Sequence, residues 1–144
     1  MTEYKVEVSE YSTRWYNSKD QLHREDGPAV ECSNGDKYYY INDKLHREDG
    51  PAMETTDGSK SYFINDKRHR EDGPAVEYAN GDKSYYINDK LHREDGPAIE
   101  YLDGYKAYYI NDKGLTEQEF NDRNKSFIDK VVEIEGVKYK LSKV

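Results

Sequence analysis

The heptapeptide HREDGPA occupies residues 23–29, 46–52, 69–75 and 92–98, so successive copies are 23 residues apart without insertion or deletion. All four histidines and all four prolines of the chain lie within these copies. This register defines four complete units, 22–44, 45–67, 68–90 and 91–113, each of which ends in Asn-Asp-Lys. A fixed period of roughly 20 to 50 residues is typical of repeat proteins, in which each unit packs mainly on its neighbours.

The flanking segments differ from the units. Residues 14–22 (RWYNSKDQL) take the place of 37–45 (KYYYINDKL) one period later, so the repeat begins in a degenerate form. Terminal repeats commonly diverge because one side faces water. The sequence therefore predicts a degenerate N-terminal cap repeat over 1–21, four β-hairpin repeats over 22–113, and a capping helix with a hairpin over 114–144.

The composition predicts a thin fold. Hydrophobic residues make up 34% of the chain and charged residues 36%, which is poor material for a thick core. Fifteen tyrosines against three phenylalanines and one tryptophan suggest a sheet whose aromatic rings are buried while their hydroxyls reach water. Cys32 is the only cysteine, which excludes an intrachain disulfide and fits a reducing compartment. With no apolar leader and no long apolar run, we expect a cytoplasmic protein, in the host cytoplasm if phage-encoded.

Each unit contains a turn dipeptide between short runs rich in Val, Ile and Tyr: Asn34-Gly35, Asp57-Gly58, Asn80-Gly81 and Asp103-Gly104. Such dipeptides favour two-residue type I′ hairpins. In the third unit this corner predicts that Val76 pairs with Tyr85, Glu77 with Ser84, and Tyr78 with Lys83. The predicted buried face then combines the apolar rows Val30, Met53, Val76, Ile99; Tyr39, Tyr62, Tyr85, Tyr108; and Ile41, Ile64, Ile87, Ile110. The alanines Ala29, Ala52, Ala75 and Ala98 fall on the opposite face.

The segment Ile-Asn-Asp-Lys-Leu predicts a second tight reversal in each unit, followed by the HREDGP corner. Its register stays open, because a two-residue and a three-residue corner at Asn88-Asp89 place Leu91 and His92 on opposite faces. After Lys113, Thr116 and Glu119 form a capping-box pattern, which predicts a short helix near 117–124. The last segment, VVEIEGVKYKLSKV, predicts a hairpin with its turn near Glu135-Gly136. The fold class is thus an elongated antiparallel β-meander, mostly β.

Charge is concentrated in the repeats. Residues 22–113 hold 13 Lys and Arg against 20 Asp and Glu, whereas 114–144 are balanced. An acidic surface disfavours phosphate backbones and anionic lipids, so we expect neither direct nucleic-acid binding nor a membrane. A protein partner should present a basic surface.

We expect no catalytic, metal or cofactor site. Histidines in equivalent positions two strands apart are separated by about 9 to 10 Å, too far for side chains to converge readily on an ion held at about 2 Å. A catalytic carboxylate pair needs one place with unequal environments, but here the same residues recur four times. The His, Arg, Glu and Asp side chains of each motif copy are therefore predicted to bond the corner's backbone and one another. The residues predicted to form this structural motif are His23, His46, His69, His92; Asp26, Asp49, Asp72, Asp95; and Gly27, Gly50, Gly73, Gly96.

The units resemble the MORN repeat family, through their aromatic residue, their basic-His segment, and the endings Tyr78-Ala-Asn-Gly81 and Tyr101-Leu-Asp-Gly104. The Asn-Gly-Lys turn of the family is Asn-Asp-Lys here. The family's Tyr-x-Gly-x-Trp opening is missing. HREDGPA-type units with an LTEQEF-like end look like chains of bacteriophages, bacteria and large viruses, and related MORN-type bacterial proteins are described as antitoxins. The resemblance implies β-hairpin units and a noncatalytic binder.

The leading hypothesis is a protein-interaction module that blocks or neutralises another protein, of an antitoxin-like or phage counter-defence type. The candidate contacts are positions that vary between units: Tyr38, Thr55, Ser61, Tyr78, Ser84, Tyr101 and Leu102. Alternatives are a structural or assembly protein that self-associates, a small-ligand sponge, and an acidic mimic of DNA.

Overall fold

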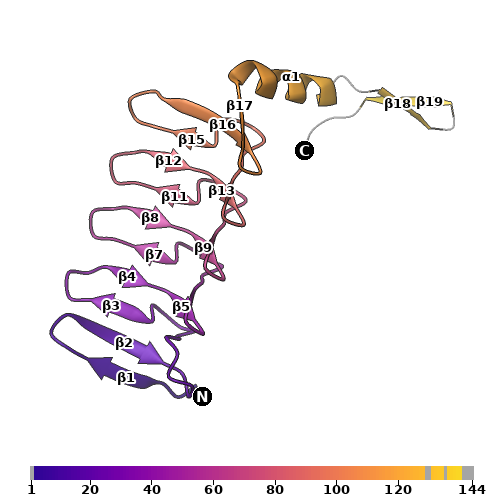
Figure 1. Cartoon of the computed structure of the whole chain (residues 1–144). Helices are drawn as coiled ribbons and strands as arrows, with labels where there is room; N and C mark the ends of the chain where they lie inside the picture. Colours follow the sequence, from indigo (N-terminus) through magenta and orange to yellow (C-terminus); the bar gives the residue numbers. More distant parts are fainter. Residues whose placement is uncertain (1, 129–130, 135, 141–144) are drawn as a thin grey trace.

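The computed structural model describes residues 2–128, 131–134 and 136–140. It shows an elongated antiparallel β-meander, with the hairpins stacked one after another from the N-terminal end to helix α1 (Glu117–Ile128; Figure 1). The predicted fold class is thereby confirmed. Its framework is one sheet of eleven strands, in which each strand pairs antiparallel with the next.

The eleven-stranded sheet forms one column of hairpins except at its last strand, which lies in the second column. Its strands, in spatial order, are β1 (Lys5–Val8), β2 (Ser12–Tyr16), β3 (Val30–Cys32), β4 (Lys37–Tyr38), β7 (Met53–Glu54), β8 (Lys60–Ser61), β11 (Val76–Glu77), β12 (Lys83–Ser84), β15 (Ile99–Glu100), β16 (Lys106–Ile110) and β17 (Lys113–Leu115). A second column begins with the two-stranded hairpins of β5 (Tyr40–Ile41) with β6 (Lys44–Leu45), β9 (Phe63–Ile64) with β10 (Lys67–Arg68), and β13 (Tyr86–Ile87) with β14 (Lys90–Leu91). In the fourth unit the end of β16 pairs with β17 around Asn111-Asp112 and takes the same place. Each HREDGP corner returns the chain from the second column to the first.

The hairpins of the first column turn where predicted, but the predicted type I′ geometry and register are wrong. In the third unit Gly81 N–H donates to the Tyr78 carbonyl, and Tyr78 N–H donates to the Asp82 carbonyl, both at 2.9 Å. Gly81 has φ of 96°, whereas Asn80 is not among the positive-φ residues. This is the pattern of a three-residue loop, a type I turn followed by a left-handed glycine.

The extra loop residue shifts every cross-strand pair by one. Val76 lies opposite Ser84, and Glu77 opposite Lys83. Because side chains alternate between faces, Val76 shares a face with Ser84 and not with Tyr85. The predicted combination of the Val76 row with the Tyr85 row on one buried face is therefore wrong.

The two-residue type I′ corners occur instead at the Asn-Asp dipeptides. Asn88 and Asp89 have φ of 50° and 65°, and the same signs recur at 42–43, 65–66 and 111–112. The pairs Tyr86 with Leu91 and Ile87 with Lys90 settle the register that the sequence left open. Asn and Asp tolerate the left-handed region better than other non-glycine residues, which explains their place here.

The core is thin and centres on alanine. Ala29, Ala52, Ala75 and Ala98 are fully buried, and Val30 and Val76 are nearly so. These alanines lie where the chain passes from a corner into the first column, and the Ala75 carbonyl accepts from Tyr62 N–H of the preceding unit at 2.8 Å. Placing the alanines away from the buried face was wrong, because the junction between the two columns excludes water more completely than either sheet face.

Helix α1 (Glu117–Ile128) follows β17 and begins with the predicted capping box. Thr116 N–H donates to Glu119 Oε2 at 2.8 Å, and Glu119 N–H donates to Thr116 Oγ1 at 3.1 Å. The hydrogen bond from Thr116 N–H is the main cause that lowers the pKa of Glu119. Phe120 is buried, and its ring centroid lies 4.9 Å from that of Tyr108 in β16. The helix therefore covers the β16 end of the sheet.

Beyond the helix, β18 (Val131–Ile134) pairs with β19 (Val137–Lys140), as the alternating pattern predicts. Gly136 has φ of 79°, and the other predicted turn residue, Glu135, lies outside the described residues together with 141–144.

At the opposite end, residues 17–21 form a loop one residue longer than the Asn-Asp corners, with Asp20 at φ of 57°. A strict 23-residue spacing would match Trp15 with Tyr38. Because of the extra loop residue, Trp15 instead takes the place that Tyr39 has in the next unit.

Candidate functional site

The arginine of each HREDGP corner donates hydrogen bonds that hold the corner together. Arg70 Nε donates to Asp72 Oδ1 at 3.0 Å, and Nη1 donates to the Pro74 carbonyl at 3.2 Å and to Glu77 Oε1 at 2.8 Å. The same three contacts recur around Arg24, Arg47 and Arg93. A planar guanidinium with donors in several directions can hold a loop and a strand at once, which an ammonium group cannot do as well.

Each guanidinium also stacks on an aromatic ring. The guanidinium carbons of Arg24, Arg47, Arg70 and Arg93 lie 3.9–4.1 Å from the ring centroids of Trp15, Tyr39, Tyr62 and Tyr85. A Cβ on the motif glycine would stand 2.9–3.0 Å from the same carbon. The arginine thus contacts an aromatic ring and also lies close to bare glycine backbone, so these glycines are required for close approach.

The histidines join one corner to the Asn-Asp turn of the same unit. His69 N–H donates to the Tyr62 carbonyl at 3.0 Å, and His69 Nδ1 accepts from Asn88 N–H at 3.1 Å. With Nδ1 as acceptor, the ring proton of the neutral form is on Nε2, which lies 3.6 Å from Glu71 Oε1. The same geometry recurs at His23, His46 and His92.

The Asn-Asp turn of each unit is bonded to the first residue of the same unit, so that the turn between β9 and β10 is held to β6 of the preceding second-column hairpin. Asp66 N–H donates to the Leu45 carbonyl at 2.9 Å, and Leu45 N–H donates to Asp66 Oδ1 at 2.7 Å. In the third unit arginine replaces the leucine, and Arg68 Nε contacts Asp89 while its guanidinium covers the Tyr86 ring at 3.9 Å. The motif side chains therefore have structural partners. Within the described ranges, no group of three or more His, Cys, Asp or Glu is arranged to hold a metal ion.

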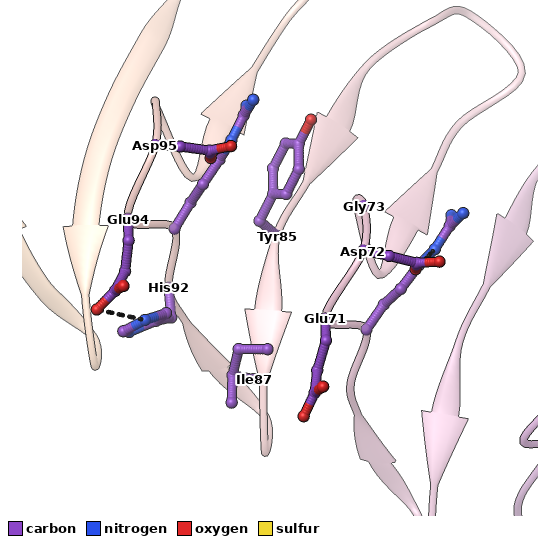
Figure 2. A pocket seen from close by; sticks show the side chains of 10 residues that line it. Glu71, Asp72, Gly73, Tyr85, Ile87, His92, Glu94 and Asp95 are labelled. Carbon is purple, nitrogen blue, oxygen red and sulfur yellow. Dashed lines mark hydrogen bonds and ion pairs between the residues drawn. The ribbon is translucent and has the colours of Figure 1, made fainter. Parts of the chain in front are cut away.

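Adjacent corners enclose a shallow groove. Figure 2 shows Tyr85 and Ile87 between the segments Glu71–Gly73 and His92–Asp95, with acidic side chains on both sides. The groove has a volume of about 670 Å³, and an equivalent one of about 660 Å³ lies between residues 24–27 and 46–49. Burial raises the pKa of Tyr85, against an opposing effect of Arg93. Because the arginines and histidines that line these grooves also hold the corners, the grooves are consequences of the repeat.

A different surface gathers exposed apolar side chains. Tyr78, Tyr101, Leu102 and Tyr105 are 53%, 43%, 76% and 53% exposed, and all four lie on or beside the loops of the last two first-column hairpins. We call these four residues the tip patch. The Tyr101 and Tyr105 rings are 5.2 Å apart between centroids.

The two loops that carry the tip patch are bonded to each other. Leu102 N–H donates to Asp82 Oδ1 at 2.8 Å, which joins the fourth loop to the third. Leu102 Cδ1 lies 3.5 Å from the position of a Cβ on Gly81. The tip patch therefore continues from one unit to the next.

The candidate contact residues fall into three groups. Tyr78, Tyr101 and Leu102 lie together in the tip patch. Tyr38, Thr55 and Ser61 are half-buried, and the Thr55 hydroxyl donates to Asp57 Oδ1 at 2.6 Å. Ser84 is buried against Val76, so it is withdrawn from the accessible contact residues.

Sequence reasoning missed Tyr105, and it predicted bonding by the motif arginines without separating their role from that of the other motif side chains. Tyr105 stands where the other units have Asp36, Ser59 and Asp82. The side chains of those three residues accept from the N–H groups of Thr56, Ala79 and Leu102 in the next unit. The fourth unit is the last, so its residue at this position has no N–H group of a next unit to bind. The presence of an aromatic residue there was the sequence signal that could have identified Tyr105.

Among the described residues, no helix is both apolar enough and long enough to cross a membrane. The chain has no match among protein-family models, curated proteins or solved structures.

Proposed function

We propose that this chain is a noncatalytic protein-binding module that blocks or neutralises its partner, and that the tip patch is its contact surface. The observation that carries the proposal is the clustering of Tyr78, Tyr101, Leu102 and Tyr105 on two adjacent hairpin loops. Tyrosines give large contact areas with a hydroxyl that tolerates water, and aromatic anchors dominate the energetics of many interfaces.

The rest of the repeat supports a framework role. The charged motif residues hold corners together, and the invariant Arg, His and Gly positions recur in every full unit. Sequence variation is concentrated at the loops, as expected when a constant framework presents a variable surface. The resemblance to MORN-type antitoxin chains points to the same class of function by analogy alone.

The partner should carry a basic rim around an apolar site. Asp82 and Asp103 lie in the loops of the tip patch, and the repeats as a whole are acidic. Opposite charge speeds encounter, and this effect weakens as salt screens it. Association should therefore slow with added salt, while the apolar contacts mainly determine dissociation.

The test compares capture from a bacterial lysate by three chains, with bound proteins identified by mass spectrometry. The wild type should retain a stoichiometric partner. The variant Tyr78→Ser/Tyr101→Ser/Leu102→Ser should lose it while keeping its circular dichroism spectrum. A matched control, Tyr11→Ser, removes a side chain that is 72% exposed at the other end of the sheet and should bind normally.

Other results support the alternative functions. Retained binding by the triple variant would reject the tip patch. Recovery of a small molecule and no protein would favour a ligand sponge, and recovery of DNA-binding proteins displaced by duplex DNA would favour DNA mimicry. Self-association without a partner would favour an assembly role.

A further inference from the structure

The two ends of the eleven-stranded sheet differ in whether another element covers them. At the C-terminal end, α1 covers the last strands, with Phe120 only 3% exposed. At the other end β1 is the outermost strand, and all four of its residues are exposed. Val6 and Val8 are 48% and 77% exposed. An edge strand of this kind is a template for pairing with another strand.

The backbone groups that β1 presents can be assigned from its neighbour. Trp15 N–H donates to the Ala29 carbonyl and the Trp15 carbonyl accepts from His23 N–H, both at 2.9 Å, so Trp15 is turned away from β1. Val6 lies directly opposite Trp15. The backbone N–H and C=O groups of Val6 therefore point away from β2, towards the open side of the sheet. Because backbone groups alternate in direction along a strand, those of Val8 point the same way.

We propose that the β1 edge binds β1 of a second copy of this chain, antiparallel and related by a two-fold axis at Val6. Outward-pointing residues must face outward-pointing residues to continue the ladder, which limits the possible registers. A two-fold arrangement is the commonest for pairs of identical chains, because one patch serves both sides.

Charge selects among the permitted registers. With Val6 opposite Val6 of the second copy, Lys5 stands opposite Glu7 of that copy, and Tyr4 opposite its Val8. Moving the register by one permitted step brings Glu7 opposite Glu7, and moving it the other way brings Lys5 opposite Lys5. Unlike charges directly across a ladder stabilise it and like charges destabilise it, so the Val6-centred register is favoured.

The existing contacts of Lys5 do not prevent this pairing. Lys5 Nζ lies 3.1 Å from both Glu7 Oε1 and Asp20 Oδ1, and all three side chains are more than half exposed. Exposed ion pairs are weak and can be exchanged at little cost. Because β1 has only four residues, the dimer should be weak and should form in the range of about 10 μM to 1 mM.

The test is sedimentation velocity on the purified full chain over this concentration range. The wild type should shift from monomer towards dimer. Lys5→Glu places Glu opposite Glu7, and Glu7→Lys places Lys opposite Lys5, so each variant alone should remain monomeric. An equimolar mixture of the two variants restores two unlike pairs and should form a heterodimer. Lys44→Glu, which makes the same charge change on β6, should behave as wild type.

Each outcome decides the proposal. A wild type that stays monomeric throughout, a single variant that dimerises like wild type, or a mixture of folded variants that stays monomeric would overturn it. Circular dichroism of each variant shows whether the sheet is intact, and the mixture provides the test that misfolding could not imitate. The tip patch lies at the other end of the repeats, so failure of either proposal leaves the other standing.

Discussion

The guanidinium carbon of Arg70 lies 3.0 Å from the point where a Cβ on Gly73 would stand. Gly73→Ala must therefore push the guanidinium aside by a few tenths of an ångström and strain its contacts with Asp72, Pro74 and the Tyr62 ring. We expect a loss of about 1 to 3 kcal/mol in the free energy of unfolding, the usual range for forcing an extra carbon into a packed site. Urea denaturation measures it, with Gly114→Ala as control, because that Cβ would meet its nearest neighbour at 3.4 Å.

A double-mutant cycle separates this clash from other effects of alanine. Once Arg70→Ala has removed the obstructing side chain, Gly73→Ala should cost much less than it does in the wild type. Additive losses in Arg70→Ala/Gly73→Ala would mean that Gly73 is needed for some other reason.

The loop glycines allow backbone strain to be separated from crowding. Gly35 and Gly58 have nearly the same φ, 99° and 96°, but a Cβ on Gly35 would lie 2.8 Å from Thr56 Cγ2, and one on Gly58 would meet nothing within 4 Å. Gly58→Ala should therefore cost only the conformational strain, on the order of 1 kcal/mol. Gly35→Ala should lower the melting temperature further.

Removing the Thr56 methyl group provides the check. In a Thr56→Ser background the two glycine substitutions should converge, because the hydroxyl that contacts Asp36 is retained while Cγ2 is lost. Equal costs for Gly35→Ala and Gly58→Ala in the wild-type background would show that the loop moves to accept the methyl group.

The repeat period and the alternation of short strands were sufficient to predict the fold class, but not the register. Both Asn34-Gly35 and Asn42-Asp43 are turn dipeptides, and the type I′ corner formed at the second while the first became part of a three-residue loop. Local propensity favours Asn-Gly for type I′. The contact of Leu22 N–H with Asp43 Oδ1 in the adjoining turn adds a tertiary reason for Asp that no local rule contains.

The candidate site was predictable to a similar extent. Variation between units marked Tyr78, Tyr101 and Leu102, which are exposed on two adjoining loops. The same criterion also selected Ser84, because a variable position can be buried when every substituent is small enough to fit. Burial of Ser84 follows from the one-residue shift in register, so the error in the loop produced the error in the site.

Acid should destabilise the fold through its loops. The pKa of Asp36 is lowered, first by the hydrogen bond from Thr56 N–H, and that of Asp57 is lowered, first by the Thr55 hydroxyl. A carboxyl whose pKa is lowered by folding stabilises the protein above its unfolded pKa of about 3.9 and loses that contribution as the pH falls through the folded pKa. Asp36→Asn should therefore lower the melting temperature at pH 7.

The pH dependence distinguishes this mechanism from simple loss of packing. The difference between wild type and Asp36→Asn should shrink below about pH 3.9, when the wild-type carboxyl also becomes protonated. Glu3→Gln, at an exposed position outside the loops, serves as the charge control. A constant difference from pH 7 to the acid limit would exclude ionised Asp36 as the cause.

The last prediction concerns which part of the chain recognises a partner. A chain ending at Ile128 keeps all of α1, including Asn124, whose side chain donates to the Glu94 carbonyl at 3.4 Å, and Phe120 remains packed on Tyr108. It lacks β18 and β19. Because the tip patch and the acidic repeats are intact, we expect this chain to bind its partner with the wild-type dissociation rate, measured by surface plasmon resonance. Normal folding with loss of binding would assign recognition to the terminal hairpin, with the repeats as its support.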